Sequence, residues 1–145
     1  MVIAIIGESC VGKSAIAKEL SQRLGGTIYT GKDYTRLAKS ETEAEAVFIA
    51  MLKEACDGET IIYVITENDH LTLLPDDAIK IVILADLDTI KERFAKRTNG
   101  NLPAPVAAML EAKHGMFDNL DCHLRIDNVG EDISAACEKI IEILV

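Results

Sequence analysis

Apolar residues in this chain follow two kinds of pattern, and the first is the pattern of buried strands. Continuous apolar runs cover residues 2–6, 61–65 and 81–85. Such runs are typical of parallel strands that are covered on both faces of a sheet. Two further segments that mix apolar and polar residues, at 27–30 and 123–127, complete a set of five predicted strands.

Between these runs, the spacing of apolar residues changes to that of amphipathic helices. Ile16, Leu20 and Leu24 stand four residues apart and precede a pair of glycines, which predicts a helix and its end. Strands that alternate with helices indicate βαβ units, hence an α/β fold with a mainly parallel sheet and helices on both faces. Four helices are predicted over 13–24, 44–55, 105–114 and 133–144, and a further short one, third in chain order, is capped by Asp88 and runs to Arg97.

Length and composition favour one globular domain. The chain has 145 residues, of which 49% are hydrophobic, and it contains no internal repeat or linker-like stretch. Its 24 acidic and 15 basic residues give a net charge of −9, which disfavours a broad nucleic-acid interface. No apolar stretch approaches the roughly 20 residues that span a bilayer, so no membrane partner is expected.

Cysteine usage and the start of the chain favour a cytoplasmic protein. The four cysteines are scattered and lack the spacing of metal ligands, so reduced thiols are the simplest interpretation. The apolar start at 2–6 is too short for the core of a signal peptide and runs directly into a glycine. A cytoplasmic location is therefore expected.

A phosphate-binding pattern follows the first predicted strand. The Walker A or P-loop pattern GxxxxGK(S/T) is matched by Gly7-Glu8-Ser9-Cys10-Val11-Gly12-Lys13-Ser14. The match stands between a buried strand and a helix, which is the context that the pattern requires. A P-loop is therefore the most specific signal in the sequence.

The residue types in this loop fit the chemistry of a nucleotide. Glycines allow turns that aim backbone N–H groups at phosphate oxygens, and the following helix adds the positive end of its dipole. Lys13 can reach the β- and γ-phosphates, and the Ser14 hydroxyl is a hard oxygen ligand for Mg²⁺. The predicted cofactors are ATP and Mg²⁺, and the predicted binding residues of the loop are Gly7, Ser9, Cys10, Val11, Gly12, Lys13, Ser14 and Ala15.

The sequence resembles the P-loop small-molecule and nucleotide kinases, among them the shikimate, gluconate and adenylate kinases. The resemblance spans nearly the whole chain and rests on the loop at 7–14, a segment with two arginines at 92–97, and a late strand and loop at 124–130. It implies a three-layer α/β/α P-loop NTPase fold with a five-stranded parallel sheet in the order 2-3-1-4-5. It also implies a single domain over 1–145 with a short lid near 98–104.

The resemblance also assigns the nucleotide contacts outside the loop. In these kinases, the first of two such arginines commonly stacks on adenine and the second reaches the phosphates, which here implies Arg93 and Arg97. Their i,i+4 spacing places both on one helix face. An exposed, solvated helix face is the alternative. Asn128 and Val129 correspond to the loop that lies against adenine in these kinases.

The acceptor side is also inferred from the resemblance. These kinases place an acid after the second strand, which makes Asp33 the candidate for orienting or deprotonating an acceptor and Arg36 the candidate for binding its carboxylate or phosphate. Gly31 stands where shikimate kinases usually carry the first acid of a DxD pattern. A helix-capping Asp33 with an exposed Arg36 is the alternative.

A second acid, Glu67, follows the third predicted strand. It is a candidate to hold Mg²⁺ through water, so both Asp33 and Glu67 are candidates for the metal-side acid. A polar strand end is the alternative for Glu67. Shikimate kinases carry a glycine triplet where this chain has residues 66–69, which disfavours shikimate as the acceptor.

Two functions are consistent with these features. The first is an ATP-dependent phosphotransferase, a monomer or homodimer that moves the γ-phosphoryl of Mg-ATP to a nucleotide, a sugar acid or a shikimate-like hydroxyl. In it, Lys13, Asp33 and Arg97 are the catalytic residues. The second is an ATP-binding regulatory or chaperone-like NTPase without a small-molecule acceptor. Gly31 and the short lid favour the second, whereas the arginine pair and the chain length favour the first.

Overall fold

Five parallel strands form one sheet at the centre of the computed structural model, which describes residues 1–127 and 132–144. Their order across the sheet is β2-β3-β1-β4-β5, which confirms the predicted fold. The strands are β1 (Val2–Ile6), β2 (Thr27–Thr30), β3 (Ile61–Ile65), β4 (Ile79–Leu84) and β5 (Leu124–Asp127). Because all five run the same way, their carboxyl ends meet at one edge, where ligands of such sheets bind.

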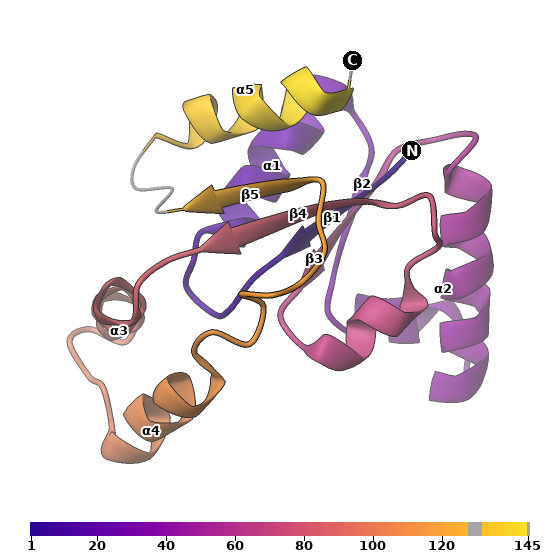
Figure 1. Ribbon diagram of the computed structural model, residues 1–145. Coiled ribbons are helices and arrows are strands. Elements are labelled where there is room, and N and C mark those ends of the chain that lie inside the picture. The colour runs from indigo at the N-terminus through magenta and orange to yellow at the C-terminus, as the bar shows by residue number, and fades with distance from the viewer. Residues whose placement is uncertain (128–131, 145) are drawn as a thin grey trace.

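Helices cover both faces of this sheet. Figure 1 shows α1 and α5 packed together on one face, α2 on the other, and α3 and α4 beyond the carboxyl end of β4. Two short 3₁₀ helices that the apolar pattern does not predict follow β2 and β3. The helices are α1 (Lys13–Leu24), η1 (Asp33–Leu37), α2 (Glu41–Ala55), η2 (Asn68–Leu73), α3 (Leu87–Arg97), α4 (Ala104–Lys113) and α5 (Ile133–Leu144).

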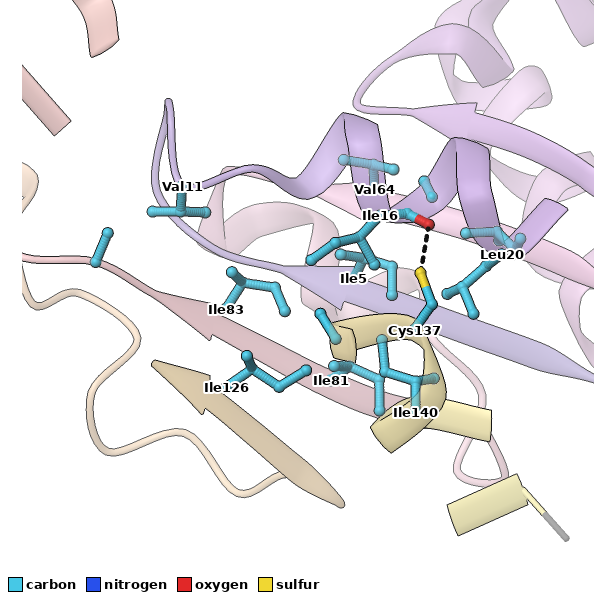
Figure 2. Packing of buried hydrophobic residues seen from close by; sticks show 14 of the residues in the cluster. Ile5, Val11, Ile16, Leu20, Val64, Ile81, Ile83, Ile126, Cys137 and Ile140 are labelled. Carbon is cyan, nitrogen blue, oxygen red and sulfur yellow. Dashed lines mark hydrogen bonds between the residues drawn. The ribbon is translucent and has the colours of Figure 1, made fainter. Parts of the chain in front are cut away.

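Two apolar clusters, one on each face, hold the layers together. Alternate residues of β1 point to opposite faces, so Ile3 and Ile5 join the cluster under α1 and α5 while Ala4 and Ile6 join the cluster under α2. Figure 2 shows the first cluster, in which the Cys137 thiol of α5 donates to the Ile16 carbonyl of α1 at 3.7 Å. Burial on both faces explains why the central strands read as continuous apolar runs.

The start of α3 differs from the prediction. The N-cap is Asp86, whose carboxylate accepts the Thr89 N–H at 2.8 Å, so the predicted cap at Asp88 is wrong. The strand before it also begins at Ile79, two residues earlier than the apolar run indicates, because Ile79 pairs with Ile3 of β1. Pairing with a neighbouring strand therefore extends β4 beyond its continuous apolar run, across Lys80 to Ile79.

The structure also bears on the expected thiols and on membrane-spanning helices. All four cysteines are free thiols. Within the described ranges, no helix combines the length and the apolar character that crossing a membrane requires.

The cluster under α2 is organised around one aromatic ring, which gives a stability prediction. Phe48 is fully buried, and its ring centroid lies 5.0 Å from that of Tyr29, 5.3 Å from that of Tyr34 and 4.9 Å from that of Tyr63. We expect Phe48→Ala to lower the free energy of unfolding by about 3–5 kcal/mol, measured by urea denaturation. Val47→Ala, at the adjacent and 41% exposed position, should change it by about 0.5 kcal/mol or less. Equal losses in the two variants would contradict this view of the core.

Candidate active site

The backbone of the loop between β1 and α1 favours glycine at two positions, Gly7 and Gly12. The Gly7 N–H donates to the Ile65 carbonyl at 3.1 Å, and a side chain at Gly7 would place its Cβ 2.6 Å from the Ile83 carbonyl oxygen. Gly12 caps α1 with a φ of 102°, a value that glycine adopts at little cost. The loop therefore passes between two strands where no larger residue fits, and it turns into the helix at Lys13.

Lys13 is buried inside this loop. Its ammonium donates to the Glu8 carbonyl oxygen at 2.5 Å, which is its only hydrogen bond among the described residues. Burial is the main cause that lowers the pKa of Lys13 from 10.5 to about 8, and the positive charge of Arg97 is a smaller contribution to the same shift. The loop thus holds a cation whose charge is poorly compensated and that an anion would stabilise.

A small hollow opens above the loop, and we call it the loop hollow. It has a volume of about 120 Å³. It brings the loop together with the ends of β2 and β3 and with Arg97 from α3, a residue far away in the sequence. Its lining residues are Ser9, Cys10, Gly12, Lys13, Ser14, Thr30, Val64, Thr66 and Arg97.

The loop hollow is not lined by Val11, Ala15 or Arg93, which were predicted to bind the nucleotide. Val11 is fully buried in the apolar cluster under α1, and Ala15 is exposed on α1. Arg93 reaches back from α3, and its guanidinium donates to the Cys10 carbonyl at 3.1 Å. Arg93 therefore ties α3 to the loop in the structure, and its contact with adenine stays a prediction.

A second hollow, which we call the α4 hollow, adjoins the first. It also has a volume of about 120 Å³ and shares Ser9 and Thr66 with the loop hollow. Glu67 lies in its wall and pairs with Lys113 of α4 at 3.0 Å. The lining residues are Glu8, Ser9, Thr66, Glu67, Met109, Leu110, Lys113 and Met116.

Sequence reasoning missed the α4 side of this hollow. Met109 and Lys113 are four residues apart on a helix and share one face, but no motif marks them. It also missed Glu8, whose buried carboxylate lies 3.0 Å from the His114 ring nitrogen Nδ1 and accepts the Gly115 N–H at 3.2 Å. A charged residue inside a loop with the P-loop pattern was the available signal for Glu8.

The residues predicted to bind the acceptor lie outside both hollows. The Asp33 carboxylate accepts the Thr30 N–H at 2.9 Å, and the Arg36 guanidinium lies 5.0 Å from the centroid of the Tyr29 ring. Both residues therefore have local partners, and their roles stay predictions. Asn128 and Val129, predicted to lie against adenine, fall outside the described residues.

The lowered pKa of Lys13 predicts that stability rises with pH. Between about pH 8 and pH 10.5, the folded chain has lost the Lys13 proton while the unfolded chain retains it. The free energy of unfolding therefore increases as the pH rises across this window. Below about pH 8, where Lys13 is charged in both states, the buried charge destabilises the folded chain in full. Relative to Lys13→Met, we expect the native chain to gain on the order of 2–3 kcal/mol across the window, measured by urea denaturation.

The control for this measurement is Lys18→Met, at an exposed position of the same helix. It should keep the pH-dependent gain of the native chain. Parallel pH curves for the native chain and Lys13→Met would contradict the assignment of the effect to Lys13.

Comparisons with known proteins identify the fold. No family model and no curated protein matches the sequence. A sugar kinase from Janibacter sp. HTCC2649 is similar in structure, with a TM-score of 0.69 and 15% identity over 99% of this chain and 93% of that chain.

Two further solved structures are similar over almost their full lengths. A shikimate kinase from Bacteroides thetaiotaomicron has a TM-score of 0.65 and 12% identity over 99% of this chain and 98% of that chain. A deoxyadenosine kinase from M. mycoides with bound dATP has a TM-score of 0.60 and 20% identity over 99% of both chains. This chain therefore has the fold of the P-loop small-molecule kinases.

Proposed function

We propose that this protein transfers the γ-phosphoryl group of ATP to a small acceptor, with Mg²⁺ bound to the nucleotide. The observation that carries the proposal is the loop hollow, where the buried Lys13 and Arg97 of α3 meet over a P-loop. Two cations that converge on one hollow suit the negative charge of a transferring phosphoryl group. The kinase folds of the similar structures support the same reaction class.

The α4 hollow is the proposed place of the acceptor. Because it shares Ser9 and Thr66 with the loop hollow, a molecule in it would lie next to the terminal phosphate. Met109, Leu110 and Met116 give it an apolar wall that helps to exclude water from the reaction. Glu67 and Lys113 offer a hydrogen-bond acceptor and a donor for polar groups of the acceptor molecule.

The described residues fit a magnesium ion that is shared with the nucleotide. They contain no group of three or more histidine, cysteine or acidic side chains that could hold a metal by itself. Mg²⁺ commonly takes only one or two protein ligands and completes its shell with phosphate oxygens and water. Ser14 lines the loop hollow and supplies a hydroxyl oxygen of the right kind. When bound, Mg²⁺ would neutralise charge on the β- and γ-phosphates.

The chain's own residues account for the remaining steps. Lys13 exchanges the Glu8 carbonyl for phosphate oxygens when nucleotide binds, and the negative charge of the phosphates stabilises its protonated form. Arg97 contacts the γ-phosphoryl group as negative charge develops on it. Arg93 keeps α3 against the loop through the Cys10 carbonyl, so that Arg97 stays in reach. The acceptor molecule displaces Lys113 from Glu67, and the Glu67 carboxylate then orients the hydroxyl group of the acceptor.

Acceptor-dependent ATP consumption tests the proposal. The purified chain is incubated with Mg-ATP and a panel of nucleoside monophosphates, nucleosides, sugars, sugar acids and shikimate, and ADP release is followed. One acceptor that raises ADP release well above background supports the kinase and names its substrate class. Nucleotide binding without stimulation by any acceptor supports the alternative, a regulatory or chaperone-like NTPase.

Removal of the loop cation should abolish the reaction. We expect Lys13→Ala to lower kcat by about 100-fold or more, because it removes the main cation at the transferring group. Lys18→Ala, on the exposed side of the same helix, serves as the control and should keep native turnover. Unchanged turnover in Lys13→Ala would defeat the assignment of the loop as the reactive site.

Arg97 is expected to act on the transition state more than on ATP binding. Arg97→Ala should lower kcat by about 10²–10³-fold and leave the Kd for ATP within a few-fold of the native value. Lys96→Ala is the matched control, since Lys96 is an exposed cation next to Arg97 on α3. A loss confined to the Kd, with kcat unchanged, would contradict this role.

A further inference from the structure

Glu8 faces both hollows, with its main chain on one side and its side chain on the other. Its carbonyl oxygen accepts the Lys13 ammonium at 2.5 Å, on the side of the loop hollow. Its side chain lines the α4 hollow and not the loop hollow, whereas the next residue, Ser9, lines both. The border between the proposed places of the nucleotide and the acceptor therefore falls at Glu8 and Ser9. The steps proposed above give the Glu8 carboxylate no role.

Both oxygens of this carboxylate contact the turn that follows α4. Oε1 lies 3.0 Å from the His114 ring nitrogen Nδ1, and Oε2 accepts the Gly115 N–H at 3.2 Å. Because an ionised carboxylate can only accept, Nδ1 carries the hydrogen of this pair. Each oxygen of Glu8 is therefore already engaged by the protein, which suits a residue that holds other groups in place.

A buried carboxylate is a costly way to hold a helix. Glu8 is 6% exposed, and it is the only buried acidic side chain within residues 1–127 and 132–144. Removing a charge from water costs free energy, and an apolar residue of similar volume often holds such a position more cheaply. Hydrogen bonds to a satisfied buried carboxylate are directional, however, and they specify one arrangement of the groups that they join.

The other contacts of α4 do not fix its direction in this way. Figure 1 shows α4 beyond the carboxyl end of β4, outside the helix layers that cover the two faces of the sheet. Leu110 is 5% exposed and joins the apolar cluster under α1 and α5, a contact without direction. Lys113 and Glu67 form a pair in which both side chains are about half exposed, and such pairs contribute little. Leu110 thus anchors α4, and Glu8 directs its end.

The position of this end determines the wall of the α4 hollow. Met109, Leu110 and Lys113 of α4 line the hollow, together with Met116. Met116 directly follows Gly115, whose N–H the Glu8 carboxylate accepts. A shift of the turn at 114–116 would therefore move the wall against which an acceptor packs.

We propose that Glu8 is a positioning residue for the acceptor, whose carboxylate seats the turn after α4 on the loop and thereby sets the shape of the α4 hollow. This role rests on the phosphoryl-transfer function proposed above. The pattern GxxxxGK(S/T) leaves the residue after its first glycine open. The side chain at this position can therefore serve the acceptor while the main chain of the loop serves the phosphates.

Hydrogen exchange followed by mass spectrometry tests the seating of α4 without any ligand. We expect Glu8→Gln, which keeps the size of the side chain and removes its charge, to speed exchange of residues 104–113 by about tenfold, the effect of weakening hydrogen bonds to a charged group. Glu8→Ala should speed it further, because a glutamine oxygen can still accept the Gly115 N–H. Exchange in α2 and α5 should stay within a few-fold of the native rate.

The matched control is Glu111→Gln. Glu111 is an exposed carboxylate of the same helix, pairs with Lys91 of α3 and does not line the α4 hollow. Because an exposed pair contributes little, this variant should keep the native exchange of residues 104–113.

Steady-state kinetics separate a positioning role from a merely structural one. With the member of the acceptor panel that stimulates ADP release, Glu8→Gln should raise the KM for that acceptor by about tenfold, because small displacements of positioning groups are costly. The Kd for ATP should stay within a few-fold of the native value, since the partner of Lys13 is the main-chain carbonyl of residue 8. Glu111→Gln should change neither constant.

Three results would overturn the proposal. The first is native exchange of residues 104–113 in both Glu8 variants, and the second is equal acceleration in α2, α4 and α5. The third is a parallel rise of the acceptor KM and the Kd for ATP in Glu8→Gln. If no panel member reacts, the proposed function fails, and the exchange comparison alone decides whether Glu8 seats α4.

Discussion

The contact between the Lys13 ammonium and the Glu8 carbonyl is the interaction on which the site depends. The cation is buried inside a loop of eight residues. The loop is fixed at one end by the Gly7 N–H, which donates to the Ile65 carbonyl of β3, and at the other end by the start of α1. Desolvation of that cation costs free energy, which the depressed pKa of Lys13 expresses. An anion in the loop hollow would offset this cost by pairing with the Lys13 ammonium. The folded chain therefore holds a preformed cation that a phosphate group would stabilise.

Two further contacts attach the rest of the site to the same loop. Arg93 of α3 binds the Cys10 carbonyl, and the Glu8 carboxylate binds His114 and Gly115 at the end of α4. The residue whose carbonyl holds Lys13 therefore also holds α4 through its side chain. The loop is therefore in direct contact with α3, which carries Arg97, and with the end of α4, which lines the α4 hollow. Under the proposed function, these contacts would connect the nucleotide site with the place proposed for the acceptor.

Local patterns predicted the strands, the helices and the loop, and the resemblance supplied the order of the strands, whereas contacts between distant segments were beyond both. Burial on both faces leaves continuous apolar runs in β1 and β3, and the P-loop pattern lies within eight consecutive residues. By contrast, Glu8 meets His114 and Lys113 meets Glu67 across separations of 106 and 46 residues, which leave no local signal. The cap of α3 was misassigned because two acids lie close together and the end of β4 decides between them. Asp33 and Arg36 were selected by resemblance, and their local contacts with Thr30 and Tyr29 depend on how β2 and η1 fold against each other.

The central claim is that the loop is a phosphate cradle whose lysine changes partner on binding. The most direct measurement is a crystal structure of the protein with Mg²⁺ and a non-hydrolysable ATP analogue. The account predicts that Lys13 leaves the Glu8 carbonyl for the β- and γ-phosphate oxygens, with Arg97 beside the γ-phosphate. An analogue bound elsewhere, with Lys13 still on the Glu8 carbonyl, would contradict it.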